Sequence, residues 1–176
     1  MEKAEKPAAC VQPAEQPVRD LSPRHPADSQ TEQQYLLMPQ HLNHYGRLFG
    51  GQLTKWIDEL AGIVARRHAN ANITTAAIDN LQFKSPAFAN QLIVLVGRVT
   101  YVGHTSMEVR VDTYTEDLAG VRRVINRAYL VEVAIDEEGN PIEVPGLLVE
   151  SPSEMAEWEG GRKRRSLRAQ RREECY

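Results

Sequence analysis

The feature that most constrains the fold is a single amphipathic helix expected among several strands. Between residues 53 and 68, largely apolar side chains recur at the three- and four-residue spacing of one helix face. This face comprises Leu53, Ile57, Leu60, Ala61, Val64, Ala65 and His68. Gly50 and Gly51 open the segment, and asparagines follow at positions 70 and 72, where we expect the helix to end.

The remaining regular segments are expected to be strands. Residues 73–83 and 107–113 alternate, residues 92–96 form a continuous apolar run, residues 121–135 make a long last strand, and residues 34–38 make an early one. One helix can cover several antiparallel strands only if the sheet wraps around it. The predicted fold class is therefore α+β, with a curved antiparallel sheet around one long helix.

Proline, glycine and charge divide the 176 residues into three parts. Residues 1–30 hold five of the ten prolines and no glycine, and we predict a disordered leader there. Residues 31–149 hold nine of the eleven glycines and most large apolar side chains, which predicts the folded domain. Residues 150–176 are charged and are expected to form a tail or a solvated helix.

Several classes of protein are disfavoured by composition. The formal net charge is −3, and no apolar run approaches the roughly 18–20 residues of a membrane helix. The basic stretch near the C-terminus has no interleaved aromatic residues and is balanced by acids, so nucleic acid is not an expected partner. Two distant cysteines, no disulfide framework and no secretory signal together predict a cytoplasmic protein.

The loop that feeds the helix is the first candidate for chemistry. Asn43, Gly50 and Gly51 lie in or directly after this loop. Glycines let backbone N–H groups approach a ligand, and a helix N-terminus carries partial positive charge, so this segment can hold an oxyanion. The alternative, which the pattern alone slightly favours, is that the glycines only shape a turn and that Asn43 is a cap.

Asp58 is the second candidate, because it shares a helical stripe with small residues. That stripe predicts close packing by another subunit or a substrate, and partial desolvation would make the carboxylate a competent general base. The alternative is an ordinary surface carboxylate beside Lys55 and Glu59. Thr75, in the strand after the helix, is by itself only a good strand former.

Other chemistries lack their sequence signatures. No histidine spacing suits a metal site, and no G-x-S-x-G elbow or glycine-rich phosphate loop occurs. Both cysteines lie outside the expected domain, which leaves covalent catalysis with little support. We therefore expect no metal and no cofactor.

Four motifs in order give the chain a family resemblance. They are N-x-x-G-x-x-F-G-G from Asn43, W-I-D-E ending at Glu59, F-x-x-P from Phe83 and G-x-T-S from Gly103. Over residues 33–149 the chain resembles the hotdog-fold acyl-CoA thioesterases of the cytosolic acyl-CoA hydrolase group. The resemblance implies a homo-oligomer in which two hotdog domains pair and three pairs form a hexamer, with the active site between the two subunits of a pair.

The resemblance also implies roles for single residues. Asn43 and Asp58 match the functional loop asparagine and helix aspartate, and Thr75 matches a strand threonine that assists. Two turns are implied to line the coenzyme A site: Lys84, Ser85 and Pro86 in the first, and Gly103, His104, Thr105 and Ser106 in the second. Lys84 and Arg98 lie beside these turns and are candidates for the phosphates of coenzyme A.

The hypothesis that follows is hydrolysis of fatty acyl-CoA to free fatty acid and coenzyme A. Asp58 would deprotonate water, while Asn43 of the partner subunit and the N–H groups near Gly50 and Gly51 would hold the carbonyl oxygen. Coenzyme A is then part of the substrate. The alternative is a hotdog sensor that binds acyl-CoA without hydrolysis. A hotdog hydratase is disfavoured, because no suitable histidine lies on the helix near Asp58.

Overall fold

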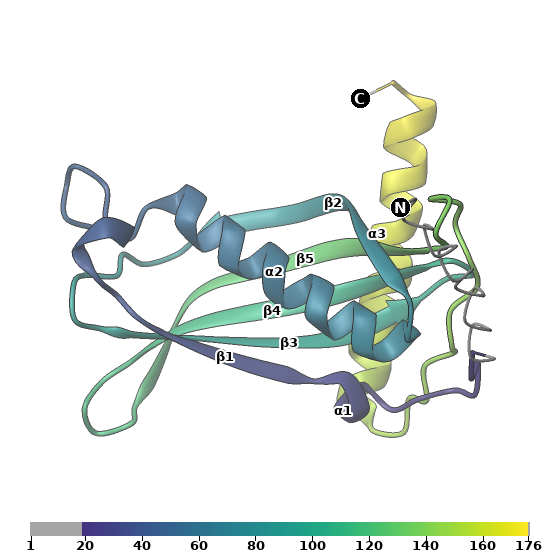
Figure 1. Ribbon diagram of the computed structural model, residues 1–176, viewed down its shortest axis with the longest axis horizontal. Helices are drawn as coiled ribbons and strands as arrows, with labels where there is room; N and C mark the ends of the chain where they lie inside the picture. The colour runs from purple at the N-terminus through teal and green to yellow at the C-terminus, as the bar shows by residue number, and fades with distance from the viewer. Residues whose placement is uncertain (1–18, 176) are drawn as a thin grey trace, which may run out of the picture.

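The computed structural model describes residues 19–175 and contains one curved sheet with a long helix in its concave face (Figure 1). The five strands pair antiparallel in the order β1-β3-β4-β5-β2. Their bounds are β1 Thr31–Leu36, β2 Asn72–Phe83, β3 Leu92–Val102, β4 Ser106–Glu116 and β5 Arg122–Ile135. The α+β class predicted from the sequence is confirmed.

Helix α2, Gly50–Ala69, is the predicted amphipathic helix. It ends at Asn70, which adopts the left-handed conformation with φ 47°. Its apolar face is buried against the sheet, and every position of the predicted face is buried. The core lies between this face and the inward side chains of β3, β4 and β5. Because one helix fills the concave face, its rotation about its axis decides which side chains face the sheet.

Gly97 in β3 lets α2 approach the sheet closely. A Cβ atom at this position would lie 2.9 Å from Cγ2 of Val64 and 3.1 Å from Cγ of Leu60, both on α2. Strand β3 continues through this glycine to Val102, well beyond the apolar run at residues 92–96 that marked it in the sequence. Strand β1 begins at Thr31, three residues before the expected early strand.

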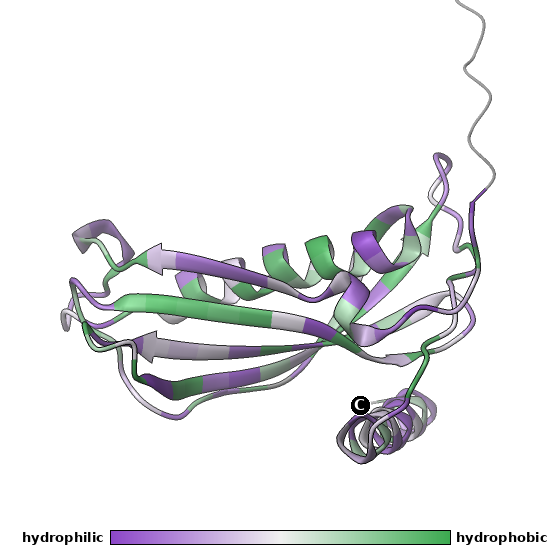
Figure 2. Ribbon diagram, turned by 90° about the horizontal axis from the view of Figure 1, so that it is seen from below, coloured by the Kyte–Doolittle hydropathy of each residue, from purple (hydrophilic) through white to green (hydrophobic). Residues whose placement is uncertain are grey.

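The last segment, α3 Pro152–Glu173, is a helix that lies on the opposite side of the sheet from α2 (Figure 2). Ser151 and Glu154 form a capping box at its start, each side chain accepting a hydrogen bond from the other residue's backbone N–H. The helix docks on buried Glu108 of β4, which pairs with Arg164 at 2.7 Å and with Arg168 at 3.1 Å. Of the two alternatives expected for residues 150–176, a tail or a solvated helix, the structure contains a helix.

Residues 19–30 differ from the disordered leader predicted over residues 1–30, whose first 18 residues lie outside the described range. The Arg24 backbone pairs with Gly146 and Leu148. The guanidinium groups of Arg19 and Arg24 donate to the Ala69 and Arg67 carbonyl oxygens, both at 2.8 Å. These carbonyls end α2 and lack helical partners, so the arginines satisfy them. Short helix α1, Pro26–Ser29, follows.

No helix in the described part of the chain combines the length and apolar character needed to span a bilayer.

The close approach at Gly97 predicts a large loss of stability when a side chain is added there. Gly97→Val should lower the free energy of unfolding by about 1–3 kcal/mol or more, because α2 must move or the core must strain. Gly160→Ala in α3 is the control, since its nearest neighbour is the flexible end of Arg164. Chemical denaturation measures both, and equal stability of Gly97→Val and the parent would contradict the packing argument.

Candidate active site

Asp58 and Thr75 are joined by a direct hydrogen bond. The Thr75 hydroxyl on β2 donates to Oδ1 of Asp58 on α2 at 2.8 Å. Asp58 is half-buried, and Thr75 is exposed on the outer strand of the sheet. The bond leaves Oδ2 of Asp58 available to a ligand or a water, so the pair presents an oriented carboxylate at the sheet edge.

A third residue, Glu132 on β5, belongs to this cluster and was missed from the sequence. It is directly opposite Thr75 in the β2–β5 register, and its carboxylate oxygens lie 3.2 and 3.5 Å from the Thr75 hydroxyl. Glu132 is fully buried, and its pKa is raised to about 7, because burial raises the pKa more than the hydrogen bond with Thr75 lowers it and the charge of Asp58 raises it further. The only sequence signal was an acid within the largely apolar second half of the strand, residues 128–135.

Asn43 is held in its loop by its own side chain. Its Oδ1 accepts hydrogen bonds from the backbone N–H groups of Tyr45 at 2.9 Å and Arg47 at 3.2 Å. Gly46, at φ 70°, completes this turn. The turn role that the sequence left open is therefore present, and it leaves the amide NH₂ of Asn43 as a donor.

The N-terminus of α2 and the first predicted turn meet at Asn43. Asn43, Gly50, Lys84, Ser85 and Pro86 line one cavity of about 360 Å³. The helix N-cap, Phe49, makes no side-chain cap hydrogen bond. The two glycines also have a packing role, because a Cβ at Gly50 or Gly51 would meet the ring of Phe83 at 3.2 Å or of Phe49 at 2.6 Å.

This cavity and the Asp58 cluster are separated along α2. Asp58 lies eight residues after Gly50, which corresponds to about 12 Å along the helix axis. Asn43 is therefore at the beginning of α2, whereas Asp58 and Thr75 are near its middle. The structure brings Asp58 and Thr75 together in one chain and places Asn43 in a different neighbourhood.

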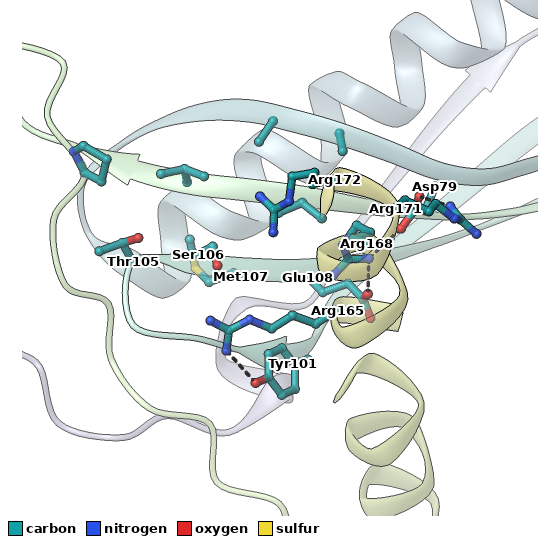
Figure 3. Close-up of a pocket in the computed structure, with 15 residues that line it drawn as sticks. Asp79, Tyr101, Thr105, Ser106, Met107, Glu108, Arg165, Arg168, Arg171 and Arg172 are labelled. Carbon is teal, nitrogen blue, oxygen red and sulfur yellow. Dashed lines mark hydrogen bonds and ion pairs between the residues drawn. The ribbon is translucent and has the colours of Figure 1, made fainter. Parts of the chain in front are cut away.

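A second, larger cavity of about 510 Å³ lies between α3 and the outer face of the sheet (Figure 3). Thr105 and Ser106 of the second predicted turn line it. Four arginines of α3 also line it: Arg165, Arg168, Arg171 and Arg172. Arg165 donates to the Tyr101 hydroxyl at 3.0 Å, and Arg168 pairs with Asp79 at 2.5 Å. The concentration of guanidinium groups suits an anionic ligand.

From the sequence, these arginines belong to the charged segment expected to be a tail or a solvated helix. Their spacing of three and four residues places them on one helix face, and that was the available signal.

Among the other predicted residues, Gly103 lies beside the Arg165 guanidinium, whereas His104 is exposed and faces Glu143 at 3.9 Å. Arg98 lines a small cavity next to α1 and the start of α3, away from both larger cavities.

The comparisons with known proteins agree with this architecture. The Thioesterase superfamily model matches residues 45–121. The chain is 36% identical over 120 residues to the uncharacterized acyl-CoA thioester hydrolase YkhA of Bacillus subtilis, an alignment covering 68% of this chain and 70% of the relative. The chain belongs to the acyl-CoA thioester hydrolases. The mammalian cytosolic acyl coenzyme A thioester hydrolases also match, and the chain spans about 40% of their length.

Solved structures of this family show the same fold. The acyl-CoA hydrolase from Staphylococcus aureus, in complex with butyryl coenzyme A and coenzyme A, is 33% identical and has a TM-score of 0.81 over 86% of this chain and 93% of that one. A hexameric acyl-CoA thioesterase is 36% identical, with a TM-score of 0.82 over 85% and 97% of the two chains. The predicted hotdog fold, with its sheet around α2, is therefore confirmed.

Three further structures of the Staphylococcus aureus acyl-CoA hydrolase carry alanine in place of an asparagine, an aspartate or a threonine. Along that chain the three substituted positions are separated by 15 and 17 residues. Asn43, Asp58 and Thr75 have the same order and the same two separations.

Proposed function

We propose that this chain hydrolyses acyl-CoA thioesters to a free fatty acid and coenzyme A, with Asp58 as the general base. The observation that carries the proposal is the hydrogen bond from Thr75, which orients Asp58 at the sheet edge of an acyl-CoA thioester hydrolase. The matching separations of the three positions substituted in the Staphylococcus aureus enzyme support the same choice of residues. The relatives named as cytosolic support a cytoplasmic location.

In the proposed reaction, Asp58 takes a proton from a water, and the hydroxide attacks the thioester carbonyl carbon. The tetrahedral intermediate then collapses with cleavage of the C–S bond. The coenzyme A thiolate leaves and takes up the proton from Asp58, which restores the carboxylate. Thr75 holds Oδ1 of Asp58 throughout, so that Oδ2 is directed at the water. This sequence requires no cofactor.

Charge developing on the carbonyl oxygen needs donors, and Asn43 and the start of α2 can supply them. The Asn43 amide NH₂ is free to donate because its Oδ1 is held by two backbone N–H groups. The partial positive charge of the α2 N-terminus, at Gly50 and Gly51, favours the same oxyanion. Since Asn43 and Asp58 lie at different places along α2, we propose that the Asn43 serving each Asp58 comes from a partner subunit.

The edge of the sheet supports pairing of two copies. Strand β2 is the last strand of the sheet and spans 12 residues, with Ile78 and Phe83 exposed on it. A long, partly apolar edge is a template for pairing with another chain. The related hexameric acyl-CoA thioesterase supports the further proposal that three such pairs assemble.

We propose that basic side chains of both cavities bind coenzyme A. Lys84 shares its cavity with Asn43, which places a cation close to the proposed oxyanion donors. Thr105, Ser106 and the α3 arginines line the larger cavity, whose charge complements the phosphates. Gly103, His104 and Arg98 remain predicted contacts that only an acyl-CoA complex can test.

The proposal predicts that Asp58→Asn lowers kcat for acyl-CoA hydrolysis by about 10²–10⁴-fold while changing KM little, because the base is lost and binding groups remain. Thiol release from a panel of short- to long-chain acyl-CoAs measures this. Glu59→Gln is the matched control, since Glu59 is an exposed neighbour paired with Lys55. Full activity of Asp58→Asn would remove Asp58 from the mechanism, and saturable binding without turnover by the parent would favour the sensor.

If the larger cavity binds the phosphates of coenzyme A, removing its arginines should weaken binding only of substrates that carry the nucleotide. The double variant Arg165→Gln and Arg172→Gln should raise KM for acyl-CoA by about tenfold or more, since charge-assisted hydrogen bonds are lost. KM for the corresponding acyl-pantetheine, which lacks the nucleotide, should not change. Arg162→Gln is the control, because Arg162 is paired with Glu159 and lies outside the cavity. Equal changes for both substrates would show that these arginines do not bind phosphate.

A further inference from the structure

Glu132 is buried, and no basic side chain of residues 19–175 pairs with it. Its side chain is fully enclosed on the core face of β5, in the same row as Leu130 and Ala134. Within residues 19–175, the hydrogen-bond partner of its carboxyl group is the Thr75 hydroxyl. An ionised carboxylate that is buried and unpaired is costly, so burial shifts such a group toward its protonated form.

The same sheet provides a contrast in Glu108. Glu108 on β4 is also almost fully buried, but on the outer face, where Arg164 and Arg168 pair with it and Thr100 donates to it. Among the residues that the structure describes, two cations pair with Glu108 and none pairs with Glu132. The absence of a cation beside Glu132 leaves protonation as the way to neutralise it.

The protonation state of Glu132 decides where the Thr75 hydrogen points. Thr75 has one hydroxyl hydrogen, and carboxylate oxygens of both Asp58 and Glu132 lie within hydrogen-bond distance of its oxygen. If Glu132 is protonated, it donates to Thr75, and Thr75 donates to Asp58. If Glu132 is ionised, two carboxylates compete for that single hydrogen.

Resting on the function proposed above, we propose that Glu132 is a positioning residue whose protonated carboxyl donates to the Thr75 hydroxyl and so directs Thr75 to hold the base Asp58. Glu132 contacts neither water nor substrate in this scheme. It keeps Asp58 the sole acceptor at the end of a two-step hydrogen-bond chain.

In the described part of the chain, one other charged group faces Glu132, the carboxylate of Asp58. On α2 the facing group is Asp58, on β2 it is Thr75, and on β4 the register partner is Met107. Burial raises the pKa of Glu132, the hydrogen bond with Thr75 lowers it and the charge of Asp58 raises it, which gives a value of about 7. The chain of hydrogen bonds is therefore complete below this pH and is lost as the pH rises through it.

The test compares pH profiles of kcat for the parent and Glu132→Gln, with Glu137→Gln as an exposed control near the end of the same strand. The parent should lose kcat above about pH 7, by roughly tenfold for each further pH unit if only the protonated form is active. Glu132→Gln donates to Thr75 at every pH, so this alkaline decrease should disappear. Parallel profiles of the parent and Glu132→Gln would overturn the proposal.

A stability measurement separates this inference from the proposed function. A carboxyl whose pKa is raised by folding destabilises the fold as the pH rises above the unfolded value of about 4.5. Glu132→Gln should therefore gain stability over the parent between pH 5 and pH 8, whereas Glu137→Gln should not. If Glu132→Gln showed no such gain in stability, the proposal that Glu132 is buried in its protonated form would be overturned, whatever the activity. A parent without turnover, combined with the expected gain, would instead overturn the proposed hydrolysis and the positioning role with it.

Two variants of Thr75 keep the positioning role testable if Glu132→Gln folds poorly. Thr75→Ser retains the hydroxyl and should keep the alkaline decrease of the parent. Thr75→Val removes the hydroxyl and should show a lower kcat without that decrease, because Glu132 no longer communicates with Asp58. An alkaline decrease that persists in Thr75→Val would contradict the role of Glu132.

Discussion

The packing of α2 into the concave face of the sheet is the constraint on which the rest of the structure depends. One helix must cover the inward side chains of several strands, so its buried face is fixed by the core. Gly97 sets how closely the helix approaches. With this rotation fixed, Asp58 lies at the edge of the buried face, next to β2. Its hydrogen bond to Thr75 is thus a consequence of core packing.

The same packing explains why the proposed site is shared between chains. The N-terminus of α2 brings Asn43 and Lys84 to one end of the sheet, whereas Asp58 lies near the middle of the helix. A rigid helix holds these groups apart within one chain. A second copy paired along β2 would allow the Asn43 of one chain to meet the Asp58 of the other. A hexameric acyl-CoA thioesterase is among the solved structures with this fold.

The sequence predicted the parts of the fold that have strong periodicity. The bounds of α2 followed from its apolar face and its flanking glycines and asparagine. Strands β2 and β4 followed from alternation, and β3 followed from a continuous apolar run. The docking of α3 did not, because this helix has no apolar stripe and is held by Arg164 and Arg168 on a buried acid. Glu132 was missed because strand spacing alone does not tell whether an acid faces the core. Nor does it tell whether a basic side chain lies beside that acid in the folded chain. The proposed roles of Asn43, Asp58 and Thr75 came from the family resemblance, and their contacts came from the structure.

The most direct test of the shared site is complementation between two inactive variants. Asn43→Ala and Asp58→Ala chains carrying different tags would be coexpressed, and the mixed assemblies would be purified through both tags. In each mixed pair, one of the two sites retains both Asn43 and Asp58. About half of the pairs in a randomly assembled hexamer are mixed, so the purified assemblies should regain about a quarter of the parent kcat per chain. Mixed assemblies that are no more active than the single variants would contradict a site built from two subunits.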